Sequence, residues 1–434
     1  MKLVRLIGTA AVLLLALALG SCGGGSGGGK KGGSISFWMQ QYGDNPQAQQ
    51  DFINGLAEKF KADTGVTVDV TYVDWGQAHT KYTLAATGGE APDVADTFFP
   101  YSWVKIGGEK YGPMIIDDVV AEIGEEGFYD VARPECYING HWYGLPWRGD
   151  TRAAAYNQQM FDEAGIAEFP KTYEELIEAG KKLTTYNADG SVDRAGFLFS
   201  IDNARFDQTW FALLAGHGGR MMNADFTRWT FNTPEGRESL QFMYDAVFTH
   251  RIVPQAVIDP SYNSGQVFMA EKAAIILGAG PDYLRNAKFN APQMAPYVRS
   301  AVMPSKTGSG VSSIAFAAPV CVFKTAKNPD AAKAWLKFFC SKEVQLEAMK
   351  QIGLVNSWLE VMNDPYFQND PWYKPFTEQT RRANSGDMPI PEFSEIDAFP
   401  SGPLNTMCAQ IMAGGDIQAA IDECYGKINS IMGN

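Results

Sequence analysis

Residues 144–157 read GLPWRGDTRAAAYN, and the character of this stretch changes midway. Glycine and proline near its start interrupt regular structure, whereas the three alanines near its end are typical of a buried strand. Between them lie an indole, two guanidiniums and a carboxylate. An indole offers a flat stacking surface, and guanidinium and carboxylate groups form directional hydrogen bonds. We therefore expect a hinge here that contributes Arg148, Asp150 and Arg152 to a ligand site, although a plain surface loop with one ion pair has a similar composition.

The length of the chain and the alternation of its elements set the expected fold. A chain of 434 residues, 45% hydrophobic and 20% charged, is globular and too long for one ordinary core. Apolar strands over 35–39, 66–73 and 92–95 alternate with helices that begin near 46 and 79, which is the pattern of an α/β fold. We predict two lobes, each a mainly parallel sheet flanked by helices, joined by a multi-strand hinge.

The order of the later elements indicates that the chain crosses between the lobes more than once. We assign residues 34–149 plus 304–345 to an N-lobe and residues 150–303 plus 346–434 to a C-lobe. The expected crossings lie at Gly149, near Pro304 and near Val344.

The N-terminus has the features of an export signal. Two basic residues precede an apolar run over 10–19, which is too short to be a stable spanning helix. Leu19-Gly20-Ser21-Cys22 then resembles the lipobox of bacterial lipoproteins. We expect residues 1–21 to be removed, Cys22 to carry lipid, and the glycine-rich residues 22–33 to tether the body to a membrane surface.

The net charge narrows the range of partners. Residues 1–21 hold two basic and no acidic side chains, so their removal changes the net charge from −13 to −15. A strongly acidic body argues against nucleic acid and against an anionic membrane surface as partners.

Motifs for catalysis and for metal binding are missing from the sequence. The four histidines lie far apart without HExxH-like spacing, and there is no nucleophile elbow, phosphate loop or complete dinucleotide fingerprint. Gly278-Ala279-Gly280 is interpreted as a tight turn. We expect no cofactor, no metal and no catalytic residue, but a glycoside hydrolase pair of carboxylates depends on geometry and stays open as an alternative.

The cysteine count leaves the pairing of the thiols open. Five cysteines follow Cys22, so at least one should be a free thiol. A disulfide between Cys408 and Cys424 in a helical hairpin and two buried thiols are both compatible with an exported protein. The other three cysteines are Cys136, Cys321 and Cys340.

Two loops of the first lobe are placed where a ligand would bind. Ligands of open α/β sheets sit beyond the carboxyl ends of the strands, which nominates residues 39–42 and 96–99. Both loops are rich in aromatic or amide side chains. The candidates are Gln40, Gln41, Thr97 and Phe98.

An ordered set of short motifs resembles the family 1 extracellular solute-binding proteins, the receptors of sugar ABC importers. After the lipobox and the tether come Ala91-Pro92-Asp93-Val94, Gly144-Leu145-Pro146 with Tyr156-Asn157 and Phe161, Asn328-Pro329-Asp330-Ala331-Ala332, Pro391-x-Phe393-x-Glu395-Ile396 and Ala419-Ala420-Ile421. The resemblance covers essentially the whole mature chain. It implies two α/β lobes that close on a carbohydrate and deliver it to a membrane permease, a monomer held at the extracytoplasmic face of the membrane by its lipid.

The resemblance also implies site residues, and it has departures. Arg148, Asp150, Gln40, Gln41 and the loop starting at Thr97 fall at sugar-binding positions of the family. Relatives often have Gly-x-Trp-Pro where this chain has Gly278-Ala279-Gly280-Pro281. They often have Gly-Gly followed by an aromatic residue where it has Ser312-Ser313-Ile314, and an Arg-Pro near the late prolines where it has Asp387-Met388. We keep Gly280 and Ser313 as candidates. Three tryptophans could supply stacking instead or belong to the core: Trp38, Trp210 and Trp358.

The expected ligand is therefore a sugar or oligosaccharide. An acidic sugar, a polyol, a peptide or another polar solute is the alternative within the same class of binding protein. A secreted carbohydrate-active hydrolase is the alternative from another class, and ligand turnover distinguishes it from a binder.

Overall fold

The computed structural model describes residues 32–41, 46–96, 100–201, 205–281, 283–354 and 356–433. The expected export signal, Cys22 and most of the tether lie outside these residues, as do Thr97 and Phe98. Among the described helices, none combines the length and the apolar character needed to cross a membrane.

The first lobe is built on a five-stranded sheet in the order β2-β1-β3-β15-β6. β1 (Ser34–Gln40) runs parallel to β2 (Thr67–Val73) and β3 (Val94–Asp96), whereas β15 (Pro319–Val322) is antiparallel to β3 and to β6 (Leu145–Pro146). Phe37 of β1 is fully buried and contacts Trp335 edge to face, with ring centroids 5.5 Å apart. The aromatic positions of strand and helix thus form one core.

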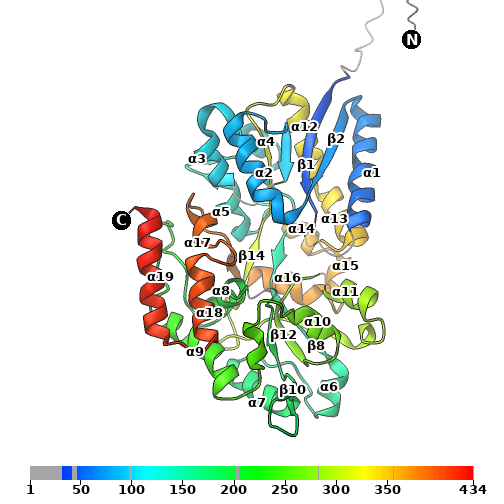
Figure 1. The fold of residues 1–434 in the computed structure, drawn as a ribbon. Coiled ribbons are helices and arrows are strands. Elements are labelled where there is room, and N and C mark those ends of the chain that lie inside the picture. The colour runs from blue at the N-terminus through cyan, green and yellow to red at the C-terminus, as the bar shows by residue number, and fades with distance from the viewer. Residues whose placement is uncertain are drawn as a thin grey trace, which may run out of the picture. The chain divides into compact units, whose positions relative to one another are not determined.

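Helices and a short hairpin complete the first lobe. α1 lies beside β2 (Figure 1). The helices are α1 (Pro46–Thr64), α2 (Trp75–Gly88), α3 (Pro100–Tyr111), α4 (Asp117–Ile123), α5 (Arg133–Cys136), α12 (Pro329–Phe339), α13 (Lys342–Ile352), α14 (Leu359–Met362) and α15 (Pro365–Gln368), and the hairpin is β4 (Tyr137–Ile138) with β5 (His141–Trp142).

The second lobe has a four-stranded sheet in the order β11-β12-β8-β13. Its strands are β11 (Leu198–Phe199), β12 (Ile275–Ala279), β8 (Ala153–Asn157) and β13 (Val298–Ala301). Only β11 and β12 pair in parallel, and β8 is antiparallel to both of its neighbours. The two-lobed α/β fold is confirmed. Both sheets are mixed rather than mainly parallel, because the strands that enter from the hinge are antiparallel to their neighbours.

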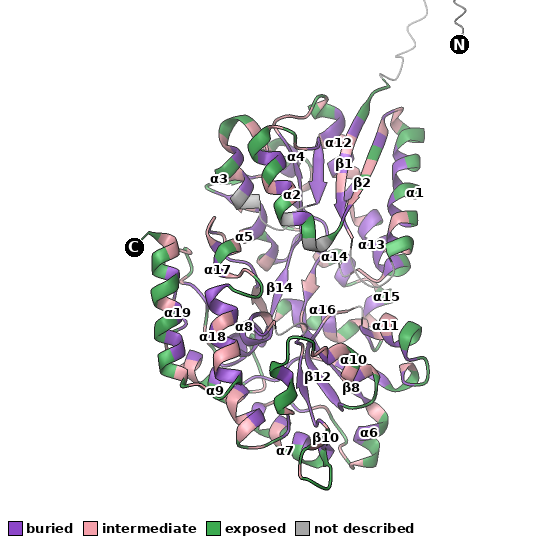
Figure 2. Cartoon of the chain, viewed as in Figure 1, coloured by how far each residue is buried: buried purple, intermediate pink, exposed green. Residues whose placement is uncertain are grey.

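The remaining elements surround this second sheet. The helices are α6 (Gln158–Glu163), α7 (Tyr173–Leu183), α8 (Asp207–Gly216), α9 (Pro234–Phe248), α10 (Ser264–Met269), α11 (Tyr283–Asn290), α16 (Tyr373–Arg381), α17 (Phe393–Ile396), α18 (Pro403–Met412) and α19 (Ile417–Met432), and the hairpin is β9 (Thr185–Tyr186) with β10 (Val192–Arg194). Figure 2 shows buried residues along the strands, and exposed residues on the outer faces of α1 and α19.

A third sheet of three short strands connects the two lobes. β14 (Ser313–Phe316) lies between β16 (Ala383–Ser385) and β7 (Asp150–Thr151). β7 follows β6 of the first sheet and precedes β8 of the second, while β14 leads into β15 of the first sheet. We call these three strands the hinge sheet.

The lobe boundaries differ from two of the predicted ones. The backbone N–H groups of Ser305 and Lys306 donate to the carbonyls of Lys171 and Gly216, so residues 304–312 pack with the second lobe rather than the first. Crossing therefore occurs beyond β14, not near Pro304. Most buried residues from 344 to 367 belong to the core of the first lobe, and most from 372 onward to the core of the second. The last crossing therefore lies after Phe367 rather than near Val344.

Local capping signals match the helix starts, and one local prediction is wrong. Thr172 and Glu175 form a capping box at α7, and the side chain of Asn328 caps α12. Gly278 does not form a tight turn: its φ of 82° accompanies a bulge inside β12. The five cysteines from Cys136 to Cys424 are free and buried, so the disulfide considered for Cys408 and Cys424 does not form.

Candidate ligand-binding site

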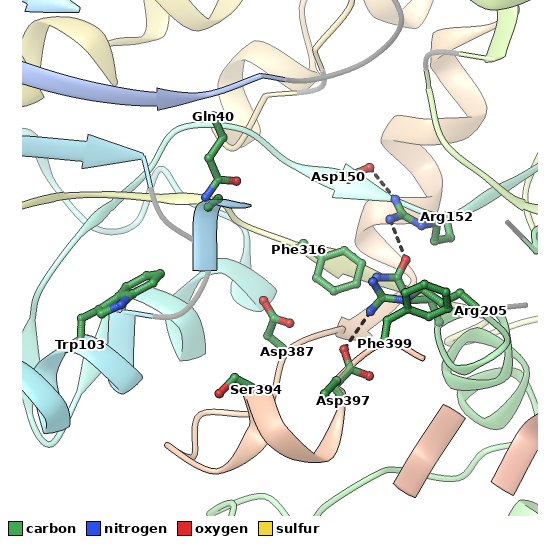
Figure 3. Close-up of a pocket in the computed structure, with 13 residues that line it drawn as sticks. Gln40, Trp103, Asp150, Arg152, Arg205, Phe316, Asp387, Ser394, Asp397 and Phe399 are labelled. Atoms are coloured by element: carbon green, nitrogen blue, oxygen red, sulfur yellow. Dashed lines mark hydrogen bonds and ion pairs between the residues drawn. The ribbon is translucent and has the colours of Figure 1, made fainter. Parts of the chain in front are cut away.

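A cavity of about 320 Å³ is enclosed by residues of both lobes and of the hinge sheet (Figure 3). A second cavity of about 250 Å³ adjoins it and shares Asp150, Arg152, Arg205 and Gln208. We call the two together the cleft. The first is lined by Gln40, Ala78, Trp103, Asp150, Arg152, Arg205, Gln208, Phe316, Asp387, Ser394, Asp397, Ala398 and Phe399.

The hinge sheet positions one pair of charged side chains in the cleft. Asp150 lies in β7, paired opposite Phe316 of β14. Its Oδ1 accepts a hydrogen bond from Arg152 Nη1 at 2.6 Å, and Arg152 Nη2 donates to Gln208 Oε1 at 3.0 Å. Arg148 lies 3.7 Å from the other oxygen of Asp150 but does not line either cavity. Asp150 is thus held by two guanidiniums.

The start of α8 positions a second guanidinium. Arg205 Nε donates to Asp207 at 3.1 Å, and its Nη2 donates to Asp397 Oδ2 at 2.9 Å. Asp207 is fully buried. Both guanidiniums that line the cleft are therefore already engaged by carboxylates of the protein.

Asp387 stands two residues beyond β16 and directs its carboxyl group into the cavity (Figure 3). It follows Gly386, where an added Cβ would come within 2.4 Å of the Phe316 ring. Only glycine permits this close approach, which brings Phe316 and Asp387 to the same cavity wall. Asp387 is 4% exposed, and the described residues offer no hydrogen-bond partner to its Oδ2.

Burial governs the ionisation of this carboxyl group. Desolvation raises the pKa of Asp387 to about 7, although Arg205 and Arg152 act in the opposite direction. Glu135 is fully buried nearby, and desolvation followed by the charge of Asp387 raises the pKa of Glu135 well above its usual range. Desolvation and Asp207 likewise raise the pKa of Asp397 against the effect of Arg205.

Aromatic rings and an amide complete the walls. The Phe316 ring lies 5.1 Å from the guanidinium carbon of Arg152, and Phe399 is 41% exposed at the rim. Gln40, at the end of β1, is 2% exposed, and the described residues offer its Oε1 no hydrogen-bond partner. Ring faces beside directional polar groups suit a polar ligand with apolar faces.

The polar side chains of the cleft are hydrogen-bond acceptors and donors. Among the described residues, no cluster of three histidine, cysteine, aspartate or glutamate side chains could hold a metal ion. The cleft instead offers several acceptors and two guanidiniums held in fixed orientations.

Comparison with known proteins connects this geometry to a family. The family model described as bacterial extracellular solute-binding protein matches residues 43–346. The chain belongs to this family. The binding protein is thus a member of a non-enzymatic, extracytoplasmic class, which removes the hydrolase alternative.

Individual relatives cover nearly the whole binding protein. It is 25% identical to a maltotriose-binding protein of Pyrococcus abyssi over 81% of this chain and 72% of the relative. It is 23% identical to the diacetylchitobiose-binding protein DasA of Streptomyces coelicolor over 99% and 98% of the two chains. The solved sugar-binding protein MalE of Xanthomonas citri has the same fold, with a TM-score of 0.77, 20% identity and 92% and 97% of the chains covered.

The binding protein brings together some of the sequence-predicted site residues. Gln40, Asp150 and Arg152 line the first cavity, and Gly280 lines the second. Six others do not line the cleft: Trp38, Gln41, Arg148, Trp210, Ser313 and Trp358.

Packing explains where the tryptophans lie. Trp210 is fully buried and donates to Ser239 Oγ at 3.0 Å, and Trp358 is 3% exposed and donates to the carbonyl of Cys340 at 2.9 Å. Trp38 stacks on Tyr82 at 5.6 Å. Trp147, in the middle of the quoted stretch, packs on Phe339 at 4.5 Å. Each of these four indoles packs in the core, so none of the four provides a stacking surface in the cleft.

Ser313 and Gln41 also lie outside the cleft for local reasons. The hydroxyl of Ser313 donates to the carbonyl of Arg152 across the hinge sheet. The backbone N–H of Gln41 donates to the carbonyl of Val73, which extends the β1–β2 pairing by one residue. Both residues hold the strands that position the site.

Sequence reasoning missed most of the second half of the cleft. Arg205 precedes α8 and Gln208 lies in its first turn, and several further polar and aromatic members come from residues 387–399. The sequence predicted no site residue in this late segment. The one sequence signal in this segment was Asp387, which stands where relatives often have the arginine of an Arg-Pro pair.

Proposed function

We propose that this protein captures a sugar or oligosaccharide by hinged closure of its two lobes and delivers it to an ABC importer. The observation that carries the proposal is a cleft lined by both lobes, in which aromatic rings lie beside fixed hydrogen-bonding groups. Sugars present hydroxyl groups at their edges and apolar C–H groups on their faces, which match these two kinds of wall. The names of the relatives from Pyrococcus and Streptomyces support a carbohydrate ligand.

Closure follows from the connectivity of the hinge sheet. Gln40 belongs to the first lobe, Arg205 to the second, and Asp150 to the hinge. A ligand that contacts all three has its complete set of contacts only when the lobes approach each other. Its differential affinity then shifts the population toward the closed form.

We expect a sugar ligand to stabilise the protein and to reduce its radius of gyration. Because the ligand binds the folded state, it raises stability by RT ln(1 + [L]/Kd), or about 2.7 kcal/mol at a hundredfold excess over Kd. A thermal-shift screen against mono- and oligosaccharides identifies the ligand, and small-angle scattering with and without it measures closure. A ligand that raises the melting temperature but leaves the radius of gyration unchanged would contradict hinged closure.

We also propose that lipid on Cys22 holds the protein at the membrane. The export signal and lipobox support this anchor. The Cys22→Ala variant should move from the membrane fraction to the soluble fraction with unchanged ligand affinity, because the glycine-rich tether separates the lipid from the body. Fractionation after a high-salt wash, with Ser21→Ala as the control, measures this. Persistence of Cys22→Ala in the membrane fraction means that another segment provides the anchor.

The charge of the cleft favours some polar solutes over others. Both of its guanidiniums are engaged by protein carboxylates, so an acidic sugar would find no available cation among the described lining residues. Neutral and cationic ligands are therefore better candidates than acidic ones.

A further inference from the structure

We propose that the ligand is a sugar bearing a protonated amino group and that Asp387 binds this group. This inference rests on the proposed sugar-binding function and specifies the class of sugar. The geometry of one side chain carries it, together with the balance of charge around the cleft.

Asp387 carries a buried hydrogen-bond acceptor that has no donor among the described residues. Its side chain lines the cavity and is almost completely removed from solvent, yet its Oδ2 has no partner among the described residues. Buried polar groups are nearly always hydrogen-bonded, so an exception that faces a binding cavity points to a ligand group. When Asp387 is ionised, the missing partner is a donor, because a carboxylate only accepts hydrogen bonds.

The balance of charge indicates a cationic donor. Of the described residues that line the cleft, Asp150, Asp387 and Asp397 are acidic, whereas Arg152 and Arg205 are basic. Arg152 is bound by Asp150, and Arg205 by Asp397 and by the buried Asp207 outside the lining. No lining cation forms a direct ion pair with Asp387 in the described part of the chain. A hydroxyl group would supply a hydrogen bond, but an ammonium group also compensates the buried charge.

The same balance disfavours other amines. An amino acid or a peptide terminus carries a carboxylate that requires its own cation, and both guanidiniums are engaged. A simple polyamine would leave the Phe316 and Phe399 ring faces without the flat C–H face that stacks on them. An amino sugar supplies the cation, the hydroxyl donors and the apolar face in one molecule.

Binding should be coupled to proton release from the site. Glu135, Asp397, Arg152 and Arg205 are the charged groups that act on Asp387 electrostatically. In the free protein, burial raises the pKa of Asp387 to about 7. A bound ammonium group lowers that pKa, because it stabilises the carboxylate. Affinity for an amino sugar should therefore increase between pH 6 and pH 8, up to the pH at which the ligand amine itself loses its proton.

The test compares sugars that differ only in the substituent at one carbon. The probes are glucose, galactose, mannose and cellobiose, each alongside its 2-amino-2-deoxy and 2-acetamido-2-deoxy counterparts. Isothermal titration with the full mature chain gives Kd at pH 6 and pH 8, and two buffers of different ionisation enthalpy give the number of protons released. We expect at least one amino sugar to bind about tenfold more tightly than both of its neutral counterparts at pH 8, with proton release.

The Asp387→Asn variant separates the carboxylate from the rest of the site. It keeps the size of the side chain and removes the charge, so it should abolish both the preference of the site for the amino sugar over its neutral counterpart and the proton release. Thermal unfolding verifies that the variant is folded. Asp69→Asn, an exposed position on β2, is the matched control and should keep the preference.

The possible results are distinct. If neutral sugars bind and no amino member of any series binds more tightly, the inference is wrong and the proposed sugar-binding function stands. A preference for the amino sugar that survives in Asp387→Asn also overturns the inference, because another residue then binds the ammonium group. If no probe of any series binds, the inference and the proposed function both fail.

Discussion

The Asp387→Asn variant should be more stable than the natural protein at pH 8, by up to about 4 kcal/mol. The pKa of Asp387 is about 7 in the folded chain, against a usual value of 3.8, and each pKa unit corresponds to about 1.36 kcal/mol. The folded state therefore binds more protons than the unfolded state between these two values. Stability consequently falls as the pH rises from 3.8 to 7 and stays reduced above that range. Asparagine cannot ionise, so the variant avoids this loss.

Urea unfolding of both proteins at pH 4, 6 and 8 measures this effect. The stability difference should be small at pH 4, where the carboxyl group is mostly protonated, and largest at pH 8. Glu135 and Asp397 also have raised pKa values, but both are present in the two proteins, so most of their contribution cancels. The exposed Asp69→Asn control should show no comparable trend. A difference that is the same at all three pH values would show that Asp387 does not titrate in the folded protein.

Arg205→Ala should lower the free energy of unfolding by about 3 kcal/mol and also remove ligand binding. Breaking a buried ion pair by deleting one partner costs about 3–5 kcal/mol, and we take the lower end because the Arg205 side chain is 31% exposed. The loss arises because Asp207 is fully buried and Asp397 is also largely buried, so both carboxylates lose their guanidinium partner.

Two companion variants test the cause of this effect. Arg205→Lys keeps the charge but cannot donate to both carboxylates with the fork of a guanidinium, so it should recover stability only in part. Adding Asp397→Asn to Arg205→Ala removes one of the unpaired carboxylates and should also recover part of the loss. Urea unfolding of the natural protein, the two single variants and the double variant measures these differences in stability. Equal stability of the single and double variants would mean that lost packing, rather than unpaired charge, explains the effect.

Local sequence signals predicted the secondary structure better than they predicted the crossings. The capping box at Thr172 and the cap at Asn328 are local, because each depends on residues three positions apart. The last crossing depends instead on which core accepts Val344 and the residues after it. An amphipathic helix such as α13 has the same pattern whichever lobe it packs against.

The site was predictable where it coincides with the hinge, at Gln40 near the end of the first strand and at Gly280 in a motif of the family. Asp150 and Arg152 are adjacent in the sequence to strand and turn signals, so their composition stood out. Arg205, Asp387 and Asp397 come from separate segments and meet only in the folded chain. The tryptophans misled for a related reason: sequence does not distinguish an indole that stacks on a ligand from one that packs, as Trp210 does, on a core phenylalanine.

The burial of all five cysteines of the folded body makes the protein a convenient starting point for a fluorescent sugar sensor. Thiol-reactive dyes attack exposed thiolates, and burial raises the pKa of Cys321, Cys340 and Cys408 away from the reactive form. Cysteines introduced at Leu84 in α2 and Phe289 in α11, which are 66% and 75% exposed, would therefore be labelled selectively. Energy transfer between dyes at these two positions, one on each lobe, would report ligand capture in real time without any native residue of the cleft being altered.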